Sequence, residues 1–291
     1  AIDDFVDVVA VPGPHYRSVP NIAGIKFIAM GDAQVKVAAF KTGEVDIVNI
    51  PAQFIKGAVE AVPGAYIQKL GEGQTLHLYN GGNFWQQTHP VTGDQLYPRE
   101  GLLVDDAHPW IGDPYAPGCD QDNLFGSVPP AKPACENMEN ARKFRWALAM
   151  VIDRDAINEI IGLGQTPPAY TFTGFSEDNP EWNDDWFIPY DPAAAKKSLS
   201  ELGISEGFKM KTWVVPDSSA LPPDIAEAAV QFWVDELGFD VEVESTNYSA
   251  RRPTLIGRTI STSMCSISQH ICSNINAIYS ARYCYIPTGY S

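Results

Sequence analysis

The sequence predicts an α/β fold, and three observations support this. Strand-like and helix-like hydrophobic patterns alternate over residues 24–79, and the same alternation returns from residue 140. A strand, helix, strand unit over 208–244 implies parallel pairing through a crossover connection. The composition, 45% hydrophobic and 19% charged over 291 residues, is that of a globular chain able to bury a large core.

The first patterned region alternates short strands with short helices. Gly43 ends the first expected helix, and Pro63 with Gly64 ends the second. The expected elements are strands at 25–29, 45–48, 66–70 and 75–79 and helices at 35–43 and 51–62.

Residues 81–139 carry no sustained period and are rich in Pro, Gly and Asp, which indicates an ordered insertion or a functional loop. Trp85 and Trp110 give this insertion side chains for packing. Cys119 and Cys135 both lie in it, and a short disulfide loop and two free thiols are equally consistent with their positions. A disulfide would place the protein outside the cytosol.

From residue 140 the periodic pattern resumes, and it degrades after Tyr248. Asp153 and Asp191 are expected to cap helices, with Pro192 at the first position of the second of these. The expected elements are helices at 140–152, 153–161, 191–202 and 224–237 and strands at 208–214 and 239–243.

The charge and the motifs exclude several functional classes. A formal charge of −16 argues against binding to nucleic acid or to an acidic membrane surface. No G-x-S-x-G, H-E-x-x-H or phosphate-loop motif is present, the five histidines are scattered, and the acidic run at 178–185 lacks calcium-loop spacing. No membrane span or signal peptide is apparent, although a removed signal would leave the same trace.

Four stretches in order resemble one family. Residues 140–172 contain A-M-V-I-D-R-D-A-I, residues 38–51 contain K-T-G-E-V-D-I-V, residues 190–208 contain Y-D-P-A-A-A-K-K-S-L, and a strand, helix, strand run follows to residue 244. Together they resemble the extracellular solute-binding proteins of the peptide and nickel type, the family 5 binding components of ABC importers. The resemblance covers about residues 20–260, interrupted by the insertion.

The resemblance implies a two-lobed periplasmic-binding-protein-like fold of type II, peptide-binding subclass, incomplete at both ends. Residues 1–79 would be part of the first lobe, and residues 80–291, with the insertion, the second lobe. The implied function is capture of a peptide or other small polar solute in an interlobe cleft for delivery to ABC transporter permease subunits. Neither enzymatic activity, a cofactor nor a bound metal is expected. A monomer is expected in the periplasm or outside the cell, reaching the membrane only through the permease or a lipid anchor.

The resemblance also locates the ligand site. The family's cleft is lined by an aromatic residue after the last clear strand and by a strand that returns 15 to 20 residues later, which correspond to Tyr248 and to residues 264–270. No Asp or Glu occurs from Ser245 onward, which weakens the oligopeptide interpretation and leaves a neutral or anionic solute open. Arg251 and Arg252 lie nearby, and arginine suits the recognition of carboxylates. The candidate ligand-binding residues are Tyr248, Arg251, Arg252, Ser266, Ser268, His270, Asn80, Trp85 and Tyr170.

Each candidate has a structural alternative. Tyr248 could be core packing, the two arginines surface charges, Asn80 the end of a strand, and Trp85 and Tyr170 packing against the insertion. At the level of function, the alternatives are an extracellular hydrolase using carboxylates from the acidic aromatic loops, and an extracellular assembly protein whose insertion contacts a partner.

Overall fold

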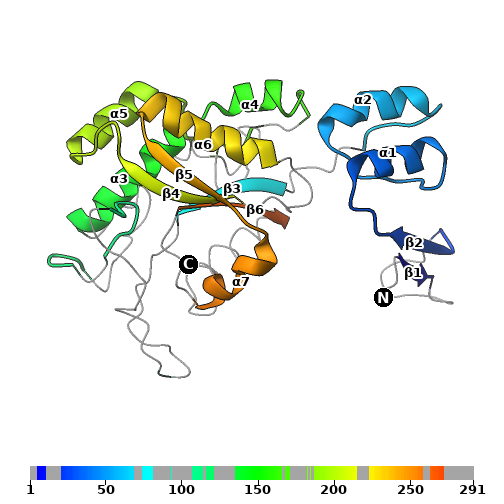
Figure 1. Cartoon of the computed structure of the whole chain (residues 1–291), viewed down its shortest axis with the longest axis horizontal. Coiled ribbons are helices and arrows are strands. Elements are labelled where there is room, and N and C mark those ends of the chain that lie inside the picture. The colour runs from blue at the N-terminus through cyan, green and yellow to red at the C-terminus, as the bar shows by residue number, and fades with distance from the viewer. Residues whose placement is uncertain are drawn as a thin grey trace. The chain divides into compact units, whose positions relative to one another are not determined.

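The structure, a computed structural model, divides into two compact units, residues 1–67 and 68–291 (Figure 1). It describes residues 5–10, 21–68, 74–80, 93, 107–113, 116–120, 135–165, 168–170, 182, 184, 187–214, 223–257 and 263–271. Trp85 therefore lies outside the described residues. The division follows residue 67, and the lobe boundary expected at residues 79–80 stays a prediction.

Unit 1 contains an antiparallel two-stranded ribbon and two helices. Asp32 begins the first helix, because its Oδ1 accepts the backbone N–H groups of Gln34 and Val35 at 2.8 and 2.9 Å. Gly43 follows the helix with φ 74°, a conformation that favours glycine. The elements are β1 (Phe5–Val9), β2 (Gly24–Ile28), α1 (Ala33–Lys41) and α2 (Ala52–Ala61), which confirm the expected strand at 25–29 and both expected helices.

The expected strand at 45–48 is wrong. The chain there is irregular, and the N–H of Val45 bonds back to the carbonyl of Ala39 in α1 at 3.4 Å. Ile47 is 90% exposed, and no described strand pairs with this segment. Residues 66–68 are also irregular, and the rest of the expected strand 66–70 lies outside the described residues. An apolar alternation forms a strand only where another strand supplies hydrogen bonds.

Unit 2 is built on a mixed four-stranded sheet. The sheet order is β3-β6-β4-β5, with β4 parallel to β5 and to β6, and β3 antiparallel to β6. The parallel pair β4 and β5, joined through a helix, confirms the crossover unit predicted from the sequence. The strands are β3 (Gln74–Asn80), β4 (Lys209–Val214), β5 (Asp240–Ser245) and β6 (Ser263–Ile271), and β6 confirms the returning strand.

Three of the five helices of the described part of unit 2 cover one face of its sheet. Buried side chains of α3, α5 and α6, among them Phe144, Leu199 and Trp233, form a core with Met210 and Val214 of β4. Each fully buried side chain of this size contributes about 1.5–3 kcal/mol. α7 lies on the other side (Figure 1). The helices are α3 (Glu136–Met150), α4 (Arg154–Ile160), α5 (Pro192–Glu201), α6 (Pro223–Leu237) and α7 (Tyr248–Gly257).

Two neighbouring residues, Asp153 and Arg154, join α3 to α4. The Asp153 carboxylate accepts the N–H of Ala156 at 2.9 Å and so caps α4, as predicted. Arg154 Nη1 donates to the carbonyls of Ala149 and Ile152 at 3.1 Å each, at the end of α3. Burial lowers the pKa of Arg154, against the smaller opposing effects of Tyr170 and Asp155. Asp153 and Arg154, which lie in the A-M-V-I-D-R-D-A-I motif, therefore stabilise the end of α3 and the start of α4.

The described part of the insertion is ordered against α3. A disulfide joins Cys119 to Cys135, the residue that precedes α3. Trp110 is 2% exposed and packs near Phe144, and its carbonyl accepts a hydrogen bond from Arg145. The disulfide alternative and the packing role of Trp110 are thus confirmed.

No helix in the described ranges combines the length and the apolar character needed to cross a membrane.

Candidate functional site

The carboxyl ends of β4 and β5 define the candidate site. In open α/β sheets, ligands bind outside the carboxyl ends of the parallel strands, where the loops converge. Here β4 ends at Val214 and β5 at Ser245, and the chain then passes through Thr246 into α7. Tyr248 is the first residue of α7, so the predicted aromatic residue lies at this edge of the sheet.

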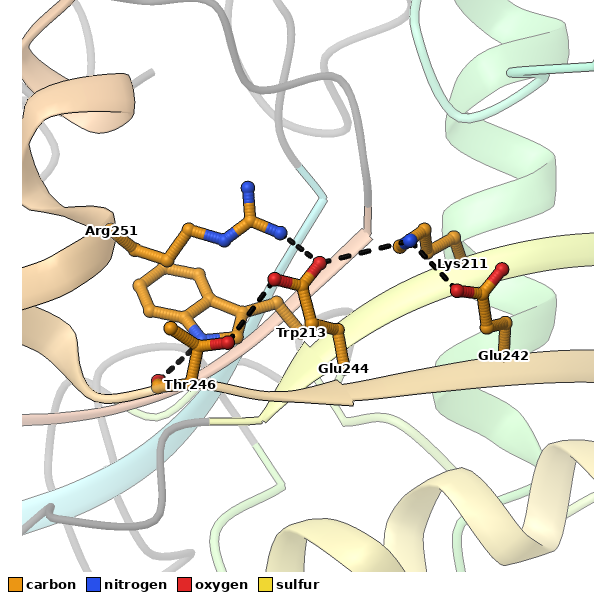
Figure 2. Close-up of polar contacts among 6 residues, drawn as sticks. All are labelled: Lys211, Trp213, Glu242, Glu244, Thr246 and Arg251. Carbon is orange, nitrogen blue, oxygen red and sulfur yellow. Dashed lines mark hydrogen bonds and ion pairs between the residues drawn. The ribbon is translucent and has the colours of Figure 1, made fainter.

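A polar network connects the two strands to α7 (Figure 2). Trp213 of β4 is fully buried, and its indole N–H donates to the carbonyl of Thr246 at 2.7 Å. Arg251 of α7 donates to Glu244 Oε2, and its guanidinium carbon lies 5.8 Å from the centre of the Trp213 ring, within cation–π range. The Thr246 hydroxyl donates to Glu244 Oε1 at 3.1 Å. The start of α7 is thereby fixed to both strands.

Lys211 extends this network along the sheet. Its ammonium lies 2.8 Å from Glu242 Oε1 and 3.8 Å from Glu244 Oε2. The pKa of Lys211 is raised, first by the hydrogen bond to Glu242 and further by the charges of both carboxylates. Two cations, Lys211 and Arg251, thus face two carboxylates, so this cluster has no net charge.

The other predicted residues occupy three places. Arg252 is exposed and adjoins Arg251 on α7, whereas Ser266, Ser268 and His270 belong to β6. Asn80 ends β3 opposite Ser263 of β6, and His270 pairs with Thr75. The backbone therefore brings Asn80 and the three β6 residues into the same sheet as Trp213 and Glu244. Their roles as ligand contacts stay predictions.

Tyr170 lies with a different group of residues. Its hydroxyl donates to Asp155 at 2.5 Å, and its ring centre is 4.9 Å from that of Phe187. Burial, followed by the hydrogen bond to Asp155, raises the pKa of Tyr170 to about 12. These contacts attach Tyr170 to α4, and a ligand contact for it also stays a prediction.

Sequence reasoning missed Trp213, Glu244 and Thr246. The alternating pattern over residues 208–214 drew attention to Phe208, Met210, Thr212 and Val214, which left Trp213 on the other face of the strand. Glu244 ends an alternating acidic series and resembles a solvated surface residue. The one usable signal was position, because all three residues lie at or next to the carboxyl ends of the parallel strands β4 and β5.

A pocket of about 400 Å³ opens near the amino ends of the same strands, and Lys211 and Glu242 of the polar network form part of its wall. Its lining includes His108, Lys209 and Asp240, and none of the predicted site residues. Across the described ranges, no three His, Cys, Asp or Glu side chains gather closely enough to hold a metal ion.

Comparisons with known proteins agree with the fold and the motifs. The model of the bacterial extracellular solute-binding proteins, family 5, matches residues 112–267, more than half of the chain. The chain therefore belongs to this family, whose members are non-enzymatic binding proteins found in the periplasm or outside the cell. No curated protein sequence matches the chain.

Solved structures of low sequence identity share the fold. A periplasmic binding protein, DppA from Helicobacter pylori in complex with the peptide STSA, superposes with a TM-score of 0.57 at 14% identity, over 98% of this chain and 45% of that one. CtaP, an ABC transporter substrate-binding protein from Listeria monocytogenes, gives 0.55 at 16% identity, over 98% and 47%. NikA from Brucella suis in complex with Fe(III)-EDTA gives 0.55 at 13% identity, over 94% and 47%.

These matches confirm the predicted two-lobed periplasmic-binding-protein-like fold of the peptide-binding type. The chain spans less than half the length of each of these three proteins.

Proposed function

We propose that the chain is part of the substrate-binding component of an ABC importer, which captures a peptide or other small polar solute in an interlobe cleft and delivers it to a membrane permease. The observation that carries this proposal is family membership over residues 112–267. The edge formed by Trp213, Thr246 and Tyr248 supports it, because polar groups converge there at the carboxyl ends of parallel strands.

The ligand site of this proposal is formed from α7, β6 and the end of β3. Tyr248 would supply an aromatic surface, and Ser266, Ser268, His270 and Asn80 would supply hydrogen-bonding groups. The protein would act outside the cytosol, which agrees with the Cys119–Cys135 disulfide. It would work as a monomer, with the permease subunits as its membrane partners.

Ligand-dependent stabilisation of the full-length protein tests the proposal. Thermal unfolding would be followed in the presence of tripeptides, amino-acid derivatives and sugars, and hits would be confirmed by isothermal titration. A ligand at a hundredfold its Kd should add about 2.7 kcal/mol to the free energy of unfolding. A complete absence of stabilisation across these classes would contradict the proposal, and sustained product release from any compound would support the hydrolase alternative instead.

Substitution of Tyr248 tests the location of the site. Tyr248→Ala should weaken binding of any ligand identified in this way at least tenfold, because an aromatic contact surface is lost. Tyr190→Ala is the matched control, since Tyr190 is exposed and its hydroxyl contacts Glu236 of α6. Equal weakening by both variants would argue against a site at α7.

A further inference from the structure

Arg251 is the most enclosed cation of the candidate site. Its side chain is 22% exposed, its guanidinium pairs with Glu244, and the ring of Trp213 lies beside it (Figure 2). Arg252, the next residue, is exposed. The two arginines that the sequence presents as equivalent carboxylate-binding groups therefore differ in structure, because the charge of Arg251 is already directed at a carboxylate of the protein.

Glu244 is the acidic group nearest the carboxyl end of β5, and both of its oxygens have partners. Arg251 occupies Oε2 and the Thr246 hydroxyl occupies Oε1. Lys211, the other nearby cation, is 3.8 Å away and makes its closer contact with Glu242 at 2.8 Å. Without Arg251, one lysine would face two carboxylates, so the edge of the sheet would have a net charge of about −1.

We propose that Arg251 is a positioning residue that also sets ligand specificity. It holds the first turn of α7, which carries Tyr248 three residues earlier on the same helical face, and it neutralises Glu244 so that this carboxylate does not attract a cationic ligand. The site would then favour solutes that are uncharged or anionic at this edge. This inference rests on the proposed function, and its test separates the two.

The decisive measurement is charge selectivity, which a purely structural role would not change. The probes are trialanine and alanyl-lysyl-alanine, with affinities measured by isothermal titration on the full-length protein. Arg251→Met should raise the affinity ratio of the lysine peptide to trialanine about three- to tenfold, as expected for one partly exposed charge. Arg251→Met combined with Glu244→Gln should restore the wild-type ratio, and Arg251→Lys should preserve it.

Arg142→Met is the matched control. Arg142 forms a comparable pair with Glu139 at 2.7 Å on the exposed side of α3, away from the site, so its loss should leave the ratio unchanged. An Arg251→Met protein that binds both peptides with an unchanged ratio would overturn the inference. A change of ratio that persists in the double variant would overturn it too, because the change would then not come from Glu244.

A ligand-free measurement decides the inference if neither tripeptide binds to the wild type. In that case the proposal that the ligand is a peptide fails. Urea unfolding of the single and double variants at Arg251 and Glu244 then gives the interaction energy between these two side chains in a double-mutant cycle. The coupling should be about two- to tenfold in the unfolding equilibrium constant, and larger than that of the Arg142–Glu139 pair. A coupling no larger than that of this surface pair would overturn the positioning role.

Discussion

Removal of the Cys119–Cys135 disulfide should lower the free energy of unfolding of unit 2 by about 3 kcal/mol. The bond joins residues 16 apart in the sequence, and the chain-entropy model gives about 3 kcal/mol for a loop near 15 residues. Its effect should extend to the core, because Cys135 directly precedes α3 and Trp110, nine residues before Cys119, packs near Phe144.

Urea unfolding of Cys119→Ala/Cys135→Ala, followed by tryptophan fluorescence and far-ultraviolet circular dichroism, would measure this loss. With a denaturant dependence near 3 kcal/mol per molar, the midpoint should fall by roughly 1 M. Reductant should shift the wild type by a similar amount and should leave the double variant unchanged, which controls for the loss of the side chains.

A double variant within about 0.5 kcal/mol of the oxidised wild type would refute this reasoning. The contacts of residues 110–113 with α3 would then hold the segment that leads to Cys119 in place without the bond. Those contacts are the hydrogen bonds from Arg145 to the Trp110 carbonyl and from the Asp113 N–H to Asn137, each 2.5 Å.

Three further predictions test individual contacts. Asp191→Ala should cost about 1 kcal/mol in urea unfolding, because its carboxylate accepts the N–H of Ala194 at the start of α5, whereas Asp191→Asn should cost little. Trp233→Phe should lower the free energy of unfolding by about 1–3 kcal/mol more than Trp110→Phe does. Both rings are buried, but among the described contacts only the indole N–H of Trp233 has an acceptor, the Leu148 carbonyl. Equal losses in the two variants would contradict this reasoning. The pKa of Tyr170 is raised from 10.0 to about 12, so its neutral form contributes stability that is complete below pH 10 and is lost as the pH rises through 12. The difference in the free energy of unfolding between the wild type and Tyr170→Phe should therefore shrink over that pH range.

The elements that the sequence predicted correctly are those whose signals are local. Asp153 and Asp191 cap their helices within three residues of their own positions, and the crossover between β4 and β5 follows from three consecutive patterns. The failed strand at 45–48 had the same kind of apolar pattern but no pairing partner among the described strands. Strand formation depends on a distant segment, which a local pattern does not contain.

The site was less predictable because its contacts join separate elements. α7 was missed, since it contains Pro253 and begins with a polar sequence, which are weak helix signals. Arg251 and Glu244 are close in sequence, but their pairing depends on the direction of α7 relative to β5. The enclosure of Arg251 by Trp213 depends on β4, which lies more than 30 residues earlier in the chain, so only the folded arrangement shows that this arginine faces a protein carboxylate.

The position of β6 between β3 and β4 has a consequence for biosynthesis. β3 begins at Gln74, whereas its hydrogen-bonding neighbour ends at Ile271. The ribosome synthesises roughly 5–20 residues per second, so tens of seconds would pass between the synthesis of β3 and that of β6. During this interval the nascent chain presents an unsatisfied strand edge, which is a hazard for aggregation. The sheet of unit 2 is therefore completed late, and chaperone protection of the unfinished chain would matter more than rapid local folding.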